Sequence, residues 1–249
     1  MKRLLLAALA LASLLVGAAF VAALAATLGA TPAANPAPTP ASILVFGGTG
    51  RLGSEIAREL VARGHEVTVF ARPSSGRERL DGLRVRIVEG DALQDDDVRR
   101  ALETRRFDVV VDALGRSESP PSFFAITGRS IARWSKQTGV RQVILHGSVG
   151  VGDSRDAWPG TPVGTLGEVL KAKEVAEQAL VDSGVPYTII RNGSLRSGPA
   201  SPRAVLVEDP RAMGPVSRAS LARLTADCVL QPRCLGKRFH GLDAPPAGD

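Results

Sequence analysis

Residues 42–72 read SILVFGGTGRLGSEIARELVARGHEVTVFAR, and this stretch decides the fold that we expect. The apolar run at 43–47 predicts a strand, and the spacing of apolar residues over 52–62 predicts a helix. The run at 66–71, rich in Val and Phe, predicts a second strand. A strand, a glycine-rich turn, a helix and another strand form one βαβ unit of a parallel sheet.

The same alternation of apolar strand runs and helical patterns continues to the end of the chain. We expect strands at 84–90, 107–115, 141–147 and 186–191, helices at 91–103, 121–138, 166–182 and 218–230, and a short end strand at 237–240. This alternation predicts the α/β class, as a Rossmann-type doubly wound parallel sheet. One such domain is expected over 43–241, followed by a flexible tail at 242–249.

The composition bounds the function. The formal net charge of the 249 residues is +6, but the positive residues are mostly arginines scattered along the chain. Aromatic residues make up only 4% of the chain, which leaves no stacking platform for single-stranded nucleic acid. A basic footprint for nucleic acid is clustered, so we expect no nucleic-acid partner. We also expect no metal site.

The front of the chain differs from the rest. Residues 1–30 are hydrophobic, and the run at 4–30 carries no charge and is long enough to cross a bilayer. We therefore expect an N-terminal hydrophobic helix, either a membrane anchor or an export signal, since Ala-Leu-Ala at 23–25 offers a cleavage pattern. Basic residues at 2–3 precede the run, and the positive-inside rule then places the domain outside the cytoplasm. Residues 31–42 form a Pro/Ala-rich linker.

The turn after the first strand has the pattern G-x-x-G-x-x-G and opens a helix, which is the context of a dinucleotide-binding turn. Its glycines permit a tight turn, a close approach of backbone to a pyrophosphate, and close packing of helix on strand. The helix start adds unpaired N–H groups and a partial positive charge. We expect cofactor contacts from Gly47, Thr49, Gly50, Arg51, Leu52 and Gly53.

The end of the second strand favours NADP over NAD. An acidic residue there would bind the adenosine ribose of NAD, but this strand ends in Phe70-Ala71-Arg72. The guanidinium of Arg72 suits the 2′-phosphate of NADP, and Arg51 can assist it.

Two further strand ends add cofactor contacts. We expect Asp91 and Ala92 near the adenine, although Asp91 is equally suited to cap a helix. Ala113, Leu114 and Gly115 are expected to let the dinucleotide pass close to the backbone.

The segments GGTGRLG, VTVFAR, GDALQDDDV, VDALG and KAKEVAEQALVDSGVPYTIIRNGSL resemble the atypical short-chain dehydrogenase/reductases. They are most similar to the NAD(P)H-binding, NmrA-like proteins and the biliverdin-IXβ and flavin reductases, over residues 42 to about 241. The resemblance implies a dinucleotide on the first turn and often a reductase of flavins, tetrapyrroles or quinone-like acceptors. It also implies an alternative, because some relatives bind the dinucleotide as sensors without turnover.

The usual Tyr-x-x-x-Lys pair of the wider superfamily is missing. The one tyrosine, Tyr187, lies inside the sixth strand with no lysine four residues later. In the helix at 166–182, a rotation of about 100° per residue puts Lys173 on the apolar face and Lys171 opposite it. That face is formed by Leu166, Val169, Leu170, Ala176 and Leu180. Lys173 is therefore a candidate catalytic residue that holds the nicotinamide ribose; alternatively, its stem passes the edge of the core to reach water.

Ser148, which follows the fifth strand, matches a serine of the family and is the second candidate catalytic residue; alternatively it is a turn serine. Two positions depart from the family pattern, with Asn192 in place of a proline and Ser220 in place of an aspartate. Without the tyrosine acid, a conjugated acceptor can still take a hydride and draw its proton from water. We expect an NADP(H)-dependent reductase of a small conjugated molecule, or else a sensor or assembly factor that binds NADP.

Cys228 and Cys234 permit one disulfide, which an exported location allows, but two unrelated thiols are equally consistent with the sequence. An exported domain conflicts with the use of NADPH, which is expected to be a cytoplasmic reductant.

Overall fold

A computed structural model describes residues 40–115, 120–157 and 164–243. The hydrophobic helix expected at 4–30 and nearly all of the linker lie outside these residues. Across the three described ranges, no helix combines the length and apolarity needed to cross a membrane.

Residues 42–71 form the expected βαβ unit. Strand β1 (Ser42–Phe46) leads through the glycine turn into α2 (Arg51–Ala62), and β2 (Glu66–Ala71) returns parallel to β1. The helix buries Ile56, Ala57 and Leu60 against the sheet, as its apolar spacing predicts.

The following units repeat this pattern. Their elements are β3 (Val85–Glu89), α3 (Asp95–Glu103), β4 (Val109–Asp112), α4 (Phe123–Gln137), β5 (Gln142–Ser148), α5 (Asp153–Asp156), α6 (Thr165–Asp182) and β6 (Tyr187–Asn192). The C-terminal part adds β7 (Leu195–Arg196), β8 (Ala204–Val207), β9 (Val216–Ser217), α7 (Arg218–Ala226) and β10 (Lys237–Asp243). Short 3₁₀ turns lie at Glu78–Leu80 and Pro232–Cys234.

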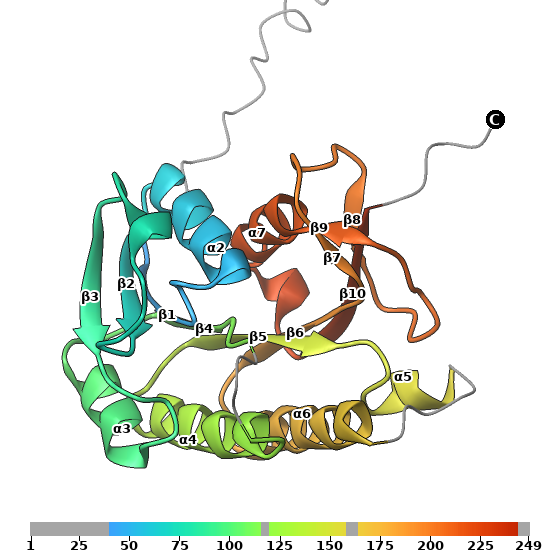
Figure 1. Cartoon of the computed structure of the whole chain (residues 1–249), viewed down its shortest axis with the longest axis horizontal. Helices are drawn as coiled ribbons and strands as arrows, with labels where there is room; N and C mark the ends of the chain where they lie inside the picture. Colours follow the sequence, from blue (N-terminus) through green and yellow to red (C-terminus); the bar gives the residue numbers. More distant parts are fainter. Residues whose placement is uncertain (1–39, 116–119, 158–163, 244–249) are drawn as a thin grey trace, which may run out of the picture. The chain divides into compact units, whose positions relative to one another are not determined.

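Eight strands form one sheet in the order β3-β2-β1-β4-β5-β6-β10-β8 (Figure 1). The expected parallel sheet is found for the first seven of these, but β8 pairs antiparallel with β10 at one edge. The sequence predicts no strand at 204–207, because Gly, Pro and Ser surround those four residues. The chain order reverses between β1 and β4, the point where open α/β sheets bind their ligands.

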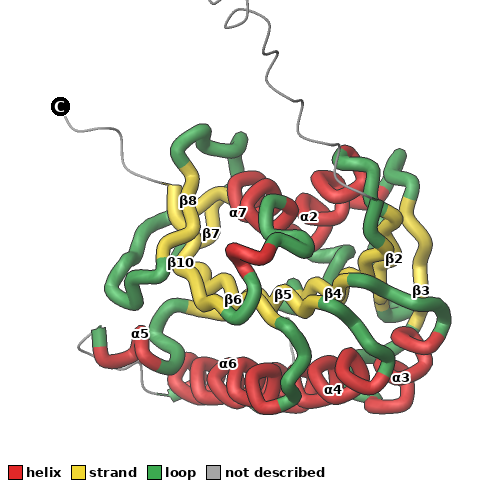
Figure 2. The backbone as a smooth tube through the Cα atoms, turned by 180° about the vertical axis from the view of Figure 1, so that it is seen from behind, coloured by secondary structure: helices red, strands yellow, loops and turns green. Residues whose placement is uncertain are grey.

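Helices cover both faces of the sheet. Helices α2 and α7 lie on one face, and α3, α4 and α6 lie on the other, as both views show (Figures 1 and 2). Successive residues of a strand face opposite layers, so Val109 and Val111 pack toward α2 and α7 while Val110 packs toward α3 and α4. The central strands are apolar on both faces for this reason.

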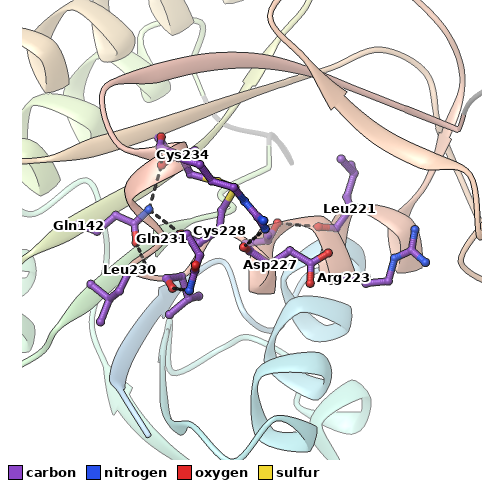
Figure 3. The surroundings of a disulfide bond; sticks show 12 residues. Gln142, Leu221, Arg223, Asp227, Cys228, Leu230, Gln231 and Cys234 are labelled. Atoms are coloured by element: carbon purple, nitrogen blue, oxygen red, sulfur yellow. Dashed lines mark hydrogen bonds between the residues drawn. A yellow bond between two sulfur atoms is a disulfide. The ribbon is translucent and has the colours of Figure 1, made fainter. Parts of the chain in front are cut away.

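A disulfide lies after α7, at the amino-terminal end of β5 (Figure 3). Cys228 and Cys234 are bonded, which decides between the two alternatives that the sequence left open. The expected helix at 218–230 ends at Ala226, four residues early, because the chain then turns back to form this bond. The fully buried Gln142 accepts the Leu230 N–H at 2.6 Å and donates to the Cys228 carbonyl at 3.0 Å.

Candidate functional site

A cavity of about 700 Å³ opens at the carboxyl ends of the parallel strands, beside the point where strand order reverses. Its volume is in the range of small-molecule and cofactor sites. All the site residues expected from the sequence line this cavity except Gly53. They are Gly47, Thr49, Gly50, Arg51, Leu52, Arg72, Asp91, Ala92, Ala113, Leu114, Gly115, Ser148 and Lys173.

The glycine turn brings three strand ends together around the start of α2. Gly47 has a φ of +77°, and a Cβ atom there would lie 2.6 Å from the carbonyl oxygen of Ala113. Gly53 lies beneath the turn, where a Cβ atom would come 2.2 Å from the carbonyl oxygen of Gly47. Both positions therefore require glycine. The first N–H groups of α2 have no partner within the helix, so the turn fits the pyrophosphate of a dinucleotide.

Four arginines line the cavity: Arg51, Arg72, Arg79 and Arg218. Within the described parts of the chain, none of them forms an ion pair, whereas Arg77 nearby pairs with Glu89. The sequence analysis did not single out Arg79 or Arg218. No sequence pattern indicated Arg218 as a site residue, because Arg218 begins a helix that is distant in sequence from the glycine turn.

Asp91 has a local role in the turn after β3. Its Oδ1 accepts the Leu93 N–H at 3.0 Å, while the N-cap residue of α3 is Gln94. Asp91 is therefore a turn residue and not the helix cap that the sequence allowed as an alternative, and it lines the cavity. A contact between Asp91 and adenine stays a prediction.

Lys173 enters the cavity from α6. Its Nζ lies 4.0 Å from the centre of the Phe124 ring, and Lys171 is exposed, as the helical periodicity predicts. Leu166, which was expected on the buried face, is 56% exposed because it stands at the first turn of the helix. Burial lowers the pKa of Lys173, and the carboxylates of Asp112 and Glu177 oppose that effect. No ion pair to Lys173 is found among the described residues.

Asp112 is a buried carboxyl group that the sequence analysis missed. It ends β4 and is only 6% exposed, and its Oδ1 accepts the Leu114 N–H at 3.0 Å. Burial raises the pKa of Asp112 to about 6, while the Leu114 N–H and the charge of Lys173 act in the opposite direction. The signal was present in VVVDALG, where a carboxylate directly follows a wholly apolar strand.

A buried ion pair lies one helical turn beyond Lys173. Glu177 accepts from Nη2 of Arg191 at 2.8 Å and from its Nε at 3.2 Å, and the other terminal nitrogen of Arg191 donates to Asp153. Gly147 on β5 leaves room for the pair, because a Cβ atom there would lie 2.5 Å from Glu177 Oε1. A buried, multiply bonded pair of this kind fixes α6 against β6, and it thereby fixes the height of Lys173 over the sheet.

His146 and Asn192 line the cavity on the face toward α7. His146 Nε2 lies 3.1 Å from Thr225 Oγ1, whose own proton goes to the Leu221 carbonyl, so Nε2 carries the imidazole proton. His146 Nδ1 then accepts from Asn192 Nδ2 at 3.3 Å. Burial lowers the pKa of His146 to about 4, so the ring is a neutral core group. Ser148, two residues further along, ends β5 and lines the cavity.

Comparison with known proteins agrees with this geometry. A family model described as NAD(P)H-binding matches residues 47–232. Sterol demethylase protein B of Methylococcus capsulatus is 30% identical over 166 residues, which cover 61% of this chain and 51% of that protein. The chain therefore spans about half the length of that relative.

Two further proteins cover more of the chain. Sanguinarine reductase of Eschscholzia californica is 27% identical over 228 residues, which cover 80% of each protein. An anaerobilin reductase from Escherichia coli O157:H7 superposes with a TM-score of 0.72 at 22% identity, over 84% of this chain and 98% of that one. At that identity the superposition shows the fold alone.

Proposed function

We propose that this chain, which belongs to the NAD(P)H-binding family, is an NADP(H)-dependent reductase of a small conjugated molecule, such as a flavin, a quinone or a tetrapyrrole. The observation that carries the proposal is one cavity lined by the glycine turn, by Arg72 and by Lys173. The glycine turn suits a pyrophosphate, Arg72 suits a 2′-phosphate, and Lys173 suits a ribose or an acceptor. The sanguinarine reductase among its relatives is in keeping with it.

The cavity residues would hold NADP along the carboxyl edge of the sheet. The N–H groups of α2 would receive the pyrophosphate, and Arg72, directly after β2, would receive the 2′-phosphate together with Ser75 in the following turn. A charge-assisted hydrogen bond of this kind contributes about 1.5–3 kcal/mol, which is enough to prefer NADP to NAD.

When bound, the reduced nicotinamide supplies a hydride. Lys173, fixed by Phe124 and by the Glu177–Arg191 pair behind it, would donate hydrogen bonds to the nicotinamide ribose. Ser148, at the end of β5, would orient the reacting ring. Val169 stands one helical turn before Lys173, where a tyrosine acid would stand, and it packs on Phe123 and Phe124. Val169 has no proton to donate, so an acceptor bound here would have to draw its proton from water.

NADPH oxidation tests the proposal. The purified chain is mixed with NADPH and, in turn, a flavin, a quinone and a bilin, and absorbance at the reduced nicotinamide band is followed. Oxidation that depends on the acceptor supports the reductase. Measurable NADPH binding with no oxidation by any of the three classes contradicts it.

A second candidate is a protein that binds NADP without turnover, as a sensor or assembly factor. The disulfide between Cys228 and Cys234 favours it, because such bonds persist in oxidising compartments. We expect no pool of NADPH there to sustain a reductase.

The proposed location of the domain also rests on the disulfide. We propose that residues 4–30 attach the chain to a membrane or direct its export, with the domain on the oxidising side. The disulfide supports this side. A reporter fused after Asp249 that is active only outside the cytoplasm would support the arrangement, and one active only inside would contradict it.

A further inference from the structure

The four unpaired arginines of the cavity separate into two groups. Arg72 and Arg79 come from the end of β2 and the turn beyond it, whereas Arg51 and Arg218 come from the first residues of α2 and α7. Arg51 and Arg218 lie close enough for the charge of Arg51 to lower the pKa of Arg218, after the larger effect of burial. Both arginines border the cavity where α2 and α7 begin, whereas Arg72 and Arg79 border it beside β2.

Helices α2 and α7 are held side by side at their far ends. Arg63, which follows α2, pairs with Asp227, which follows α7, at 2.7 Å, and it donates to the Arg223 carbonyl at 3.3 Å. Their starts are consequently fixed relative to one another at the wall of the cavity. Arg218 has one further contact, from Nη1 to Ser197 Oγ at 3.5 Å, which is a neutral partner.

Two guanidinium groups that line the same cavity at neighbouring helix starts, neither paired with an acid among the described residues, raise the free energy of the site. Across the described residues, neither Arg51 nor Arg218 has a carboxylate within 4.0 Å, although Arg58 on α2 and Arg63 directly after it both do. An anion placed between them removes the repulsion and gains charge-assisted hydrogen bonds from both.

We propose that Arg51 and Arg218 form an anion clamp, closed by α2 on one side and α7 on the other, that holds a phosphate or carboxylate group of the acceptor. This inference rests on the proposed function, which it deepens by assigning the acceptor to the anionic conjugated molecules. Arg218 directly follows β9, and β9 pairs with β7, the strand that comes next after β6. For this reason we assign the clamp to the acceptor side of the cavity. Asn192, Gly193 and Leu195 from that segment line the same wall.

The same chemistry could instead serve the cofactor, whose pyrophosphate lies at the start of α2. Flavin mononucleotide and riboflavin distinguish the two sources, since they share one conjugated ring and differ by a phosphate. Binding of each to the purified full-length chain is followed by quenching of flavin fluorescence, which requires no turnover. Binding of NADPH is measured separately. The variants are Arg218→Met, Arg51→Met and, as a conservative replacement, Arg218→Lys.

The parent is expected to bind flavin mononucleotide about tenfold or more tightly than riboflavin, and Arg218→Met should remove most of this preference. Arg218→Lys should restore part of it, because lysine keeps the charge but not the fork. The control is Arg203→Met, an exposed change in the same C-terminal part that does not line the cavity.

If Arg218→Met leaves the flavin preference intact but weakens NADPH binding by a similar factor, the clamp holds the cofactor's pyrophosphate and the assignment to the acceptor is overturned. Unchanged affinity for all three ligands overturns the clamp itself. A clear preference for flavin mononucleotide without any NADPH oxidation would support the clamp while removing the reductase, so the two failures are distinguishable.

Discussion

Lys173 of α6 and Phe124 of α4 meet at the wall of the cavity, with the ammonium nitrogen 4.0 Å from the centre of the ring. A cation above an aromatic face is attracted by about 0.5–2 kcal/mol. The ring therefore holds the ammonium group in place while leaving its N–H donors available to a ligand. Burial opposes the charge at the same time, so this position is arranged for binding more than for stability.

Lys173→Met tests whether Lys173 serves ligand binding, because methionine keeps the packing on Phe124 and removes the N–H donors of the ammonium group. We expect kcat/KM with NADPH to fall about tenfold to a hundredfold, with thermal stability unchanged or slightly raised. Lys171→Met, on the exposed side of the same helix, should alter neither quantity. A variant at 173 that lost stability but kept its turnover would assign the lysine to the core.

Arg72→Asp tests the choice of cofactor. The exposed guanidinium of Arg72 has no acidic partner in the described parts of the chain, and it lines the cavity at the end of β2. Replacing it by a carboxylate should weaken NADPH binding about tenfold to a hundredfold and leave NADH binding equal or improved. Arg77→Asp, at a side chain already paired with Glu89, is the matched control. Equal NADPH affinity in the parent and Arg72→Asp would remove the basis for NADP.

The pH dependence of stability depends on two buried groups with opposite effects. In the unfolded chain Asp112 loses its proton near pH 3.8, whereas in the folded chain Asp112 keeps its proton up to about pH 6. The contribution of Asp112 to the free energy of unfolding therefore falls as the pH rises through that range. His146 takes up a proton near pH 6.5 when unfolded and near pH 4 when folded, so its contribution rises over nearly the same range.

Asp112→Asn removes the first effect and leaves the second. Relative to the parent, the melting temperature of the variant should climb between pH 4 and pH 6.5, and at pH 7 the variant should be more stable by about 1–3 kcal/mol. Melting curves of both proteins across this range measure the difference, in which the titrating groups that do not interact with Asp112 cancel. A constant difference across the range would mean that Asp112 titrates normally.

The sequence predicted those parts of the fold and site that depend on local pattern. The glycine turn, the alternating strands and the inward side of Lys173 all follow from spacing along one element, and the structure places them as expected. Asp112, Glu177 and Arg218 depend instead on which elements become neighbours. Glu177, four residues after Lys173, faces Arg191 only because α6 packs across β5 and β6. The early end of α7 likewise depends on a bond between two cysteines that sequence alone could not pair.

The disulfide should stabilise the domain without affecting the cavity. Cys228 and Cys234 are six positions apart, and closing so short a loop in the unfolded chain contributes roughly 2 kcal/mol. The loop contacts Gln142 at the amino-terminal end of β5, whereas Ser148 lines the cavity at the other end of that strand. Cys228→Ala/Cys234→Ala should therefore melt about 4–8 °C lower and bind NADPH with unchanged affinity.

Dithiothreitol provides the matched control for this pair. It should lower the melting temperature of the parent to that of the double variant and leave the variant unaffected, because only the parent has a bond to reduce. Both cysteines are buried, at 1% and 3% exposure, so reduction of the folded protein should be slow and should accelerate near the melting temperature. A parent that melts at the same temperature with and without the reductant would show that the two thiols contribute no cross-link to stability.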